Sequence, residues 1–332
     1  MCKEIDTASG TVIMEIENAS YSYEGEDNWV WKQISCQFYK GKIHAIAGAS
    51  GCGKSSLLYL LNGMIPHMIE GKIEGSVFFE GKNITDELPR YRCRKIGLVM
   101  QSPESQFCTF TVEEELAFGM ENLSLPPEEI KRRIAQTLEY VGMEGYEKCD
   151  LNNLSGGQKQ KVAIASILVM EPEVLLLDEP TANLDPKSRQ EIFSLIVRLS
   201  REQGRTIILV EHNLEEIIDE IDYLSVMSPK GELLSGKQGQ DIFQKNHVPG
   251  RNISKTAEEK AETKAERSTV LEISDLKFTY QKSGKNSLTN NQWILDGLDL
   301  SVKEQDFLAI VGENGSWKVH PAAIDFSDYP AE

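Results

Sequence analysis

The chain has 332 residues, and its 40% hydrophobic and 26% charged content is that of an ordinary folded protein rather than a disordered one. With 52 acidic and 35 basic residues, its formal charge of −17 argues against nucleic-acid binding, which needs a field of Lys and Arg. At roughly 150 residues per domain, the length predicts two domains, or one large domain and a fragment.

Strand and helix patterns alternate between residues 11 and 245. Apolar runs predict strands at Ile43–Ala47, Lys95–Met100, Val174–Leu177 and Thr206–Glu211. Helices are predicted at Lys54–Asn62, Pro127–Val141, Gln158–Val169 and Lys187–Gln203. This alternation predicts an α/β domain with a substantial parallel sheet, and about 235 residues are enough for a full core.

The apolar runs are of strand length, far short of the ~20 residues that span a bilayer. The first residues contain no basic and apolar regions typical of a secretory signal. The six cysteines are scattered without a CxxC pair, which favours reduced thiols over a disulfide framework or a zinc site. We therefore expect a protein of the cytosol.

A glycine-rich loop joins the first predicted strand to the helix at Lys54–Asn62 and matches the pattern GxxxxGK[ST]. Its residues are Gly48, Ala49, Ser50, Gly51, Cys52, Gly53, Lys54 and Ser55. Glycines let successive backbone N–H groups point at a phosphate chain, and the helix N-terminus adds its partial positive charge. We expect Lys54 to reach the β- and γ-phosphates, Ser55 to bind Mg²⁺, and Ser56 to lie near the phosphates. The alternative is a glycine-rich turn without a ligand.

The strand at Val174–Leu177 ends in two acids, Asp178 and Glu179. Downstream of a phosphate-binding loop, this pattern predicts that Asp178 holds Mg²⁺ through water, opposite Ser55. Glu179 is placed to polarise an attacking water as a general base.

Leu154 is followed by Ser155, Gly156 and Gly157, and then by Gln158, the first residue of a predicted helix. A serine and two glycines at a helix N-terminus offer a second anion site, although alone they are typical of an N-cap and a tight turn. This LSGGQ sequence resembles the signature motif of ATP-binding cassette (ABC) proteins.

Other marks of the ABC family surround the signature in the family's order. Tyr23 resembles the aromatic residue that stacks on adenine, and Gln101 the Q-loop glutamine that touches Mg²⁺ and senses the membrane partner. Asp185 ends a stretch similar to the D-loop, and His212 resembles the switch histidine that contacts the γ-phosphate. In isolation, Tyr23 would be read as a core aromatic and His212 as a histidine satisfied after a strand.

The resemblance covers nearly all of residues 11–245 and implies the P-loop NTPase fold of an ABC ATPase cassette. That fold is α/β, with a parallel-sheet core, an antiparallel β subdomain and a helical subdomain that carries the signature. The implied activity is ATP hydrolysis with Mg²⁺, in which Lys54, Gln101, Glu179 and His212 act at the catalytic site. In the family two cassettes pack head to tail, so Ser155, Gly156 and Gly157 would contact the nucleotide of an opposing cassette.

Two segments narrow the resemblance to the ATPases of energy-coupling-factor (ECF) importers, which take up vitamins and transition-metal ions such as cobalt. The first lies after the predicted strand at Lys95–Met100 and comprises Gln101–Phe107 and Thr111–Gly119. The second is Glu211–Glu216. The implied partners are a second cassette, a transmembrane coupling subunit and a substrate-binding membrane subunit. The chain would then lie peripherally on the cytoplasmic face of the membrane, with the region Gln101–Phe118 near the groove for a coupling helix.

The sequence also contains the start of a repeat. Residues 15–23 (EIENASYSY) recur as 272–280 (EISDLKFTY), 257 positions later, and Gly48 recurs as Gly312, 264 positions later. We therefore predict a complete cassette at 11–245, a charged linker at 246–269 and the N-terminal fragment of a second cassette at 270–332.

The second copy keeps an aromatic residue, Tyr280, and the sequence Gly312–Ser316, but Trp317 stands where the first copy has Gly53. Reading the gene one base later forces a glycine at that codon and permits Lys, Ser and Thr after it. We expect a one-base frameshift near Trp317 in a natural double-cassette protein, with a divergent tail as the alternative. Two other functional readings stay open, a soluble non-transport ABC ATPase and a catalytically impaired truncated product.

Overall fold

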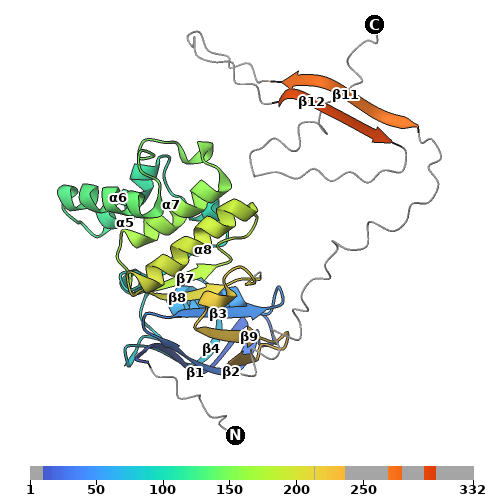
Figure 1. Cartoon of the computed structure of the whole chain (residues 1–332). Coiled ribbons are helices and arrows are strands. Elements are labelled where there is room, and N and C mark those ends of the chain that lie inside the picture. The colour runs from blue at the N-terminus through green and yellow to red at the C-terminus, as the bar shows by residue number, and fades with distance from the viewer. Residues whose placement is uncertain (1–9, 213, 236–267, 279–294, 304–332) are drawn as a thin grey trace. The chain divides into compact units, whose positions relative to one another are not determined.

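A computed structural model describes residues 10–212, 214–235, 268–278 and 295–303 of the chain (Figure 1). The chain divides into two units, Met1–Val248 and Pro249–Glu332. The predicted domain boundaries at 245 and 269 stay predictions, since most of the linker lies outside the described residues, as do Tyr280 and Trp317.

The first unit alternates strands and helices as the sequence predicts. Its strands are β1 (Val12–Tyr23), β2 (Trp31–Tyr39), β3 (Ile43–Gly48), β4 (Gly71–Phe79), β5 (Lys82–Asn83), β6 (Ile96–Val99), β7 (Val174–Asp178), β8 (Thr206–Val210), β9 (Tyr223–Met227) and β10 (Leu233–Ser235). Its helices are α1 (Lys54–Asn62), α2 (Met64–His67), α3 (Pro89–Arg92), α4 (Pro103–Gln106), α5 (Val112–Asn122), α6 (Pro127–Val141), α7 (Gly156–Leu168) and α8 (Pro186–Arg201), with 3-10 turns at Leu151–Asn153 and Ile218–Glu220. In the described ranges no helix is both long enough and apolar enough to cross a bilayer.

Two helices begin earlier than their residue patterns suggest, because polar side chains cap them. The sequence predicts a helix from Gln158, whereas α7 begins at Gly156, after the N-cap Ser155. Asp185 caps α8 in the same way and accepts a hydrogen bond from the backbone of Ser188. Helices α1 and α6 have the predicted bounds.

The central sheet has the strand order β10-β9-β3-β8-β7-β6. All neighbouring pairs from β9 to β6 are parallel, and β10 is antiparallel to β9. The predicted α/β fold with a parallel-sheet core is therefore confirmed. Strands β3, β6, β7 and β8 are each followed by one of the candidate motifs, so parallel pairing brings these motifs to one edge of the sheet.

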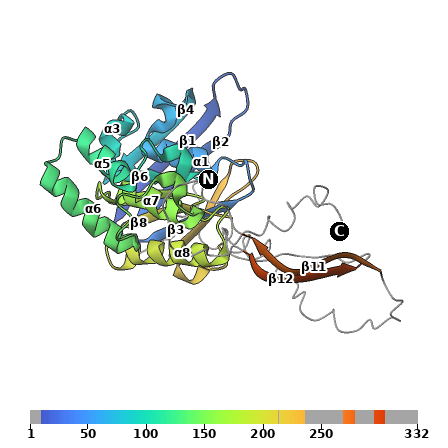
Figure 2. The ribbon, with the colours of Figure 1, turned by 90° about the horizontal axis from the view of Figure 1, so that it is seen from above.

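The central sheet is buried on both faces, as a parallel sheet with covered faces requires. Successive residues of a strand point to opposite faces. Accordingly, Leu175 and Leu177 of β7 belong to one core with residues of α5, α6, α7 and α8, while Val174 and Leu176 belong to a second core with α1 and the antiparallel sheet. Figure 1 shows these layers, with α5 to α8 on one side of the sheet and β1, β2 and β4 on the other. From above, α6 lies at the rim of the unit (Figure 2).

The antiparallel sheet has the order β2-β1-β4-β5 and is joined to α1 through a buried arginine. Arg92, at the end of α3, is 1% exposed. Its guanidinium donates to the carbonyl oxygens of Leu60 (2.9 Å) and Leu61 (3.1 Å) in the last turn of α1, and to that of Thr85 (2.9 Å) after β5. Burial lowers the pKa of Arg92 to about 10, within the range where it stays charged. A cation at this end of α1 stabilises the helix and fixes it against the loop after β5.

A buried histidine anchors the start of β3. His44 Nε2 accepts a hydrogen bond from the backbone N–H of Tyr39 at 2.8 Å, and the imidazole stacks on Tyr223 with ring centroids 4.8 Å apart. Burial lowers the pKa of His44 to about 4. The protonated form is therefore disfavoured in the folded chain relative to the unfolded one.

This burial makes stability depend on pH. The folded pKa of His44 lies below the unfolded value of about 6.5. The contribution of the buried neutral imidazole to stability is therefore complete above about pH 6.5 and is lost as the pH falls toward 4. Between pH 7 and 5 we expect His44 to account for a loss of about 2 kcal/mol in the free energy of unfolding. Urea unfolding of the full chain at both pH values measures the loss, and His44→Gln should reduce it by that amount. An equal pH dependence in the two proteins would contradict this account.

The described part of the second unit is a hairpin of β11 (Thr269–Phe278) and β12 (Leu295–Lys303). Every pair that β11 makes with β12 has a counterpart between β1 and β2, 257 positions earlier in the first strand and 264 earlier in the second. The register shifts fall at the same places, and Asp275 (φ 48°) repeats the left-handed backbone of Asn18 (φ 49°). The hairpin thus repeats the register of the first two strands of the chain.

Candidate active site

The glycine-rich loop runs from β3 into α1, and its middle residues are exposed. Ala49, Ser50 and Gly51 are exposed, whereas Cys52 is buried. Gly53 is the N-cap of α1 and has a left-handed backbone (φ 96°). A Cβ atom at this position would lie 2.5 Å from Val30 Cγ1, so glycine is required here by packing as well as by conformation. The first N–H groups of α1 are thereby left at the loop, as an anion site requires.

Lys54 lies folded over the loop that it belongs to. Its ammonium group donates to the carbonyl oxygens of Gly48 (2.9 Å) and Ala49 (2.8 Å), and the residue is only 4% exposed. The two carbonyl contacts hold the ammonium group beside the exposed middle of the loop, where Lys54 can compensate the charge of a bound phosphate.

Ser55 joins the loop to the end of β7. Its hydroxyl donates to Asp178 Oδ1 at 3.0 Å. Burial raises the pKa of Asp178, and the neighbouring Glu179 carboxylate adds to this effect, while the hydrogen bond from Ser55 and the charge of Lys54 lower it. A hydroxyl beside a partly desolvated carboxylate is the hard oxygen donor set that Mg²⁺ prefers, so these residues fit a magnesium ion. The ion would supply Lewis-acid polarisation of phosphate oxygens.

Glu179 lies between two other predicted catalytic residues. Gln101 Nε2 donates to Glu179 Oε2 at 2.8 Å, and His212 Nε2 lies 2.8 Å from Glu179 Oε1. The backbone of Glu179 is left-handed (φ 47°), a strained conformation for a residue with a side chain. This turn, immediately after the last strand residue, brings the carboxylate between the loops that follow β6 and β8.

Tyr23 reaches the same region from the end of β1 in the antiparallel sheet. Its hydroxyl lies 2.7 Å from Ser56 Oγ, and 36% of the residue is exposed. The ring also lies edge-on to Tyr21, with centroids 5.0 Å apart. Tyr23 therefore presents a partly exposed aromatic ring next to the phosphate loop. Its stacking on a base stays a prediction.

The residues of the LSGGQ sequence gather in a second group. Ser155 and Gln158 form a reciprocal capping box at the start of α7. A Cβ at Gly157 would lie 2.6 Å from Ser188 Oγ, and that hydroxyl donates to Asp185 Oδ2 at 2.7 Å. Hydrogen bonds from the backbone and the hydroxyl of Ser188 hold the pKa of Asp185 below its usual value. Thus Ser188 joins the signature turn to the D-loop.

Sequence reasoning gave no role to three residues in or next to the predicted site: Tyr59 interacts with Asp178, Glu211 accepts from the backbone of His212, and Thr181 contacts Glu211. Burial raises the pKa of Tyr59, and the charge of Asp178, with which Tyr59 interacts, raises it further. Tyr59 lies one helical turn after Ser55, a spacing that could have placed it on the same face of α1. Thr181 Oγ1 donates to Glu211 Oε2 at 2.8 Å, a contact between distant segments that no local pattern indicates.

Comparison with known proteins assigns the family. A profile of the ABC transporter family matches residues 31–182. The chain is 34% identical over 342 residues to a putative HMP/thiamine import ATP-binding protein of Bacillus subtilis, covering 92% of this chain and 60% of the relative. It is 41% identical over 232 residues to a putative ABC transporter ATP-binding protein of Pyrococcus abyssi, covering 70% of this chain and 82% of the relative. The chain belongs to the family of ABC transporter ATP-binding proteins.

The structure of cbiO1 from Clostridium perfringens, part of the ABC transporter complex cbiONQ, is similar to this chain with a TM-score of 0.63 at 34% identity. The similarity covers 72% of this chain and 93% of that one. The predicted ABC cassette fold is therefore confirmed. Members of the ABC family bind ATP with Mg²⁺ and couple its hydrolysis to transport. This chain spans only 60% of the length of the Bacillus relative.

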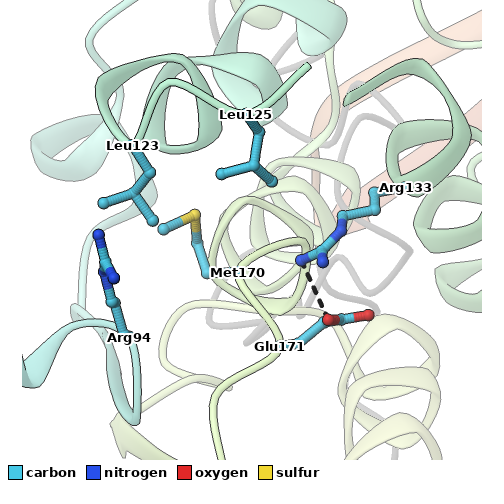
Figure 3. Close-up of a pocket in the computed structure, with 6 residues that line it drawn as sticks. All are labelled: Arg94, Leu123, Leu125, Arg133, Met170 and Glu171. Atoms are coloured by element: carbon cyan, nitrogen blue, oxygen red, sulfur yellow. Dashed lines mark ion pairs between the residues drawn. The ribbon is translucent and has the colours of Figure 1, made fainter. Parts of the chain in front are cut away.

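The ABC cassette also contains a pocket of about 360 Å³ that is lined by none of the predicted site residues. Figure 3 shows Met170 at its centre, below Leu123 and Leu125, which follow the end of α5. The ion pair of Arg133 with Glu171 (3.0 Å) lies on one side and Arg94 on the other. The pocket is thus apolar at its centre and charged at its rim.

Two of the three glycines of the loop, Gly51 and Gly53, should differ in their tolerance of a side chain. Gly53→Ala places Cβ 2.5 Å from Val30 Cγ1 and 2.8 Å from Trp31 Cδ1, so we expect a loss of about 3 kcal/mol in the free energy of unfolding. Gly51 also has a left-handed backbone (φ 77°), but no atom lies within 4 Å of its added Cβ. Gly51→Ala should therefore cost only the backbone strain of about 1 kcal/mol. Urea unfolding compares the two, and equal losses would contradict the packing argument.

Proposed function

We propose that the chain is the ATP-hydrolysing subunit of an ECF-type ABC importer that takes up a vitamin or a transition-metal ion. The observation that carries the ATPase part is the contact set around β7. Ser55 donates to Asp178, and Gln101 and His212 both lie 2.8 Å from the carboxylate of the adjacent Glu179. Three separate segments thus converge on two neighbouring acids at the phosphate loop.

Each residue has a proposed part in hydrolysis. The backbone N–H groups of the loop and Lys54 bind the phosphates of ATP, and Tyr23 stacks on the base. Ser55, Asp178 and Gln101 would hold Mg²⁺. Glu179 accepts the proton of the attacking water, and His212 contacts the γ-phosphate. Because both oxygens of Glu179 already have partners in this structure, Gln101 and His212 also orient the general base.

The second group of site residues supports a head-to-tail pair of cassettes. Ser155 and Gly156 are exposed at the N-terminus of α7, an end that favours negative charge. We propose that they contact, with Gly157 and Gln158, the triphosphate bound to the loop of an opposing cassette. Asp185 would assist from the D-loop, where its contact with Ser188 fixes it beside the signature turn. ATP would then close the interface and hydrolysis would release it.

The importer assignment draws on the comparisons. The Bacillus relative is named as a putative HMP/thiamine import protein, and the Clostridium structure as part of the complex cbiONQ. These names, together with the ECF-like segments after Gln101 and Val210, support membrane import on the cytoplasmic face of the membrane. The partners would be a transmembrane coupling subunit and a substrate-binding membrane subunit, while the transported molecule is contacted by those subunits.

The pocket beside α5 and α6 is the proposed contact for the coupling subunit. Large apolar side chains are exposed on the same helical part of the cassette, at Phe110 (77% exposed) and Phe118 (45% exposed). Exposed aromatic rings and apolar pockets are each typical of protein interfaces. We propose that a helix of the coupling subunit covers Phe118 and inserts an apolar side chain next to Met170.

The repeated hairpin supports a double-cassette origin for the second unit. Its register matches that of β1 and β2 pair by pair, and the alignment with the longer Bacillus relative covers 92% of this chain. We propose that residues 270–332 are the start of a second cassette. Sequencing the gene beyond the codon of Trp317 tests the proposed frameshift, because an intact cassette should continue in the shifted frame.

Replacing the general base should stop turnover without preventing binding. We expect Glu179→Gln to reduce kcat for phosphate release at least about 100-fold, because the amide cannot accept the proton. ATP affinity, measured by titration of a fluorescent ATP analogue, should change less than about twofold. Glu121→Gln, on the exposed side of α5, is the matched control and should keep full activity. Turnover by Glu179→Gln at the level of the control would contradict the assignment.

A charge change at the pocket should separate docking from ATP binding. We expect Arg94→Glu to lower the amount of integral membrane protein that co-purifies from detergent-solubilised host membranes, by about fivefold or more, with ATP affinity unchanged. Lys131→Glu makes the same charge change on α6, where the lysine side chain is 69% exposed outside the pocket. Co-purification with ribosomes in place of membrane subunits would contradict the importer proposal and favour a soluble ABC ATPase.

A further inference from the structure

Glu211 is a buried acid that the proposed roles do not use. It follows directly after β8, and only 4% of it is exposed. Its Oε2 accepts the hydroxyl hydrogen bond of Thr181 at 2.8 Å, and its Oε1 accepts the backbone N–H of His212 at 2.9 Å. Burying a carboxylate is costly unless hydrogen bonds compensate it, so an acid at the end of an apolar strand requires an explanation.

The sheet register explains how Glu211 reaches both segments. Asp178 of β7 pairs with Val210 of β8, so the segments that leave these strands start side by side. The backbone N–H of Glu179 donates to the carbonyl oxygen of Val210 at 2.9 Å and continues the contact by one residue. Thr181 then lies opposite Glu211, whose carboxylate bridges the two segments. Figure 1 shows β7 and β8 as neighbours.

The bridge closes a ring of contacts around the proposed general base. Glu179 and Thr181 belong to the segment after β7, and Glu211 and His212 to the segment after β8. Thr181 contacts Glu211, Glu211 holds the backbone of His212, and the His212 ring lies 2.8 Å from Glu179. The position of the His212 ring relative to Glu179 is therefore set from two sides, by its own contact and by the buried carboxylate.

A second bridge ties the same segments together farther from the acids. Arg189 of α8 donates to the carbonyl oxygen of Leu184 in the D-loop at 3.4 Å and pairs with Glu216 at 3.1 Å. Leu214, which lies between Glu211 and Glu216 in the sequence, is fully buried and fixes the segment to the core. The D-loop and the segment that carries His212 are thus connected both inside the protein and at its surface.

We propose that Glu211 is a positioning residue that couples the segment leading into the D-loop to the switch histidine. The proposal rests on the ATPase function proposed above. Glu211 itself touches no reacting group. It fixes the peptide that carries His212, so its loss should disturb the arrangement of His212 with Glu179 and lower kcat, while the phosphate loop keeps its affinity for ATP.

The test compares variants of Glu211 and Thr181 in the full chain. Glu211→Ala removes both contacts, and we expect kcat to fall about tenfold or more with ATP affinity changed less than about twofold. Glu211→Gln should restore most of kcat, because the amide oxygen can accept from His212 N–H and the Thr181 hydroxyl can accept from the amide N–H. Thr181→Val should lower kcat, and the double variant Thr181→Val with Glu211→Ala should be no worse than Glu211→Ala alone. The control is Glu215→Gln, an exposed acid four positions later, which should keep full activity.

A readout that needs no hydrolysis separates this proposal from the ATPase proposal. The imidazole ¹H and ¹⁵N NMR signals of His212, assigned by comparison with His212→Gln, should shift in Glu211→Ala and Thr181→Val and stay unchanged in Glu215→Gln. Unchanged His212 signals together with wild-type kcat in Glu211→Ala would overturn the positioning role. If Glu211→Ala does not fold, Thr181→Val with normal signals and normal kcat overturns it equally. If the wild-type chain shows no turnover but the His212 signals shift in Glu211→Ala and Thr181→Val, only the ATPase function is overturned.

Discussion

Parallel pairing of β3 with β8 and of β8 with β7 places the carboxyl ends of these strands at one edge of the sheet. The register joins Ile46 to Val210 and Val210 to Asp178, so the phosphate loop, the two acids and the switch segment begin at the same level. The contact of Ser55 with Asp178 depends on this alignment, because its two residues are 123 positions apart in the chain. A shift of one residue in either pairing would turn the alternating side chains of a strand to the opposite core.

The same sheet explains why the cassette has two cores. Each strand sends alternate residues to the helical side and to the side of α1 and the antiparallel sheet. The buried side chains of α1 pack in the second core, and Arg92 fixes the last turn of that helix. The phosphate loop is therefore clamped at both ends, by β3 and by a supported helix. In the proposed ATP site, the local N–H groups and Lys54 would supply the attraction for phosphate despite the net charge of −17.

Much of the fold could be predicted from the sequence because its signals are local. The apolar run before the glycine-rich loop and the regular pattern of α6 gave the right elements, and α1 and α6 have the predicted bounds. Caps explain the small errors at α7 and α8, where Ser155 and Asp185 extend the helices toward the N-terminus. The contacts of Arg92, His44 and Glu211 could not be predicted, since each depends on which distant backbone groups meet in the folded core.

The candidate site shows the same division. Motif spacing suggested which residues belong together, and the structure brings Gln101, Asp178, Glu179 and His212 beside the phosphate loop. It also separates the signature residues into a group with Asp185, held together through Ser188. The repeat offsets read from the sequence recur in the strand pairing of the second unit, because a β-hairpin's register follows its own sequence pattern.

The most direct measurement for the central claim, that the Ser55–Asp178 contact marks a magnesium-dependent ATP site, is the affinity of the full chain for ATP with and without Mg²⁺. For the wild-type chain the account predicts affinity at least about tenfold higher with Mg²⁺. Asp178→Asn should abolish this difference and keep the magnesium-free affinity, because the phosphate loop is unchanged. An Asp178→Asn variant with the wild-type dependence on Mg²⁺ would contradict the account.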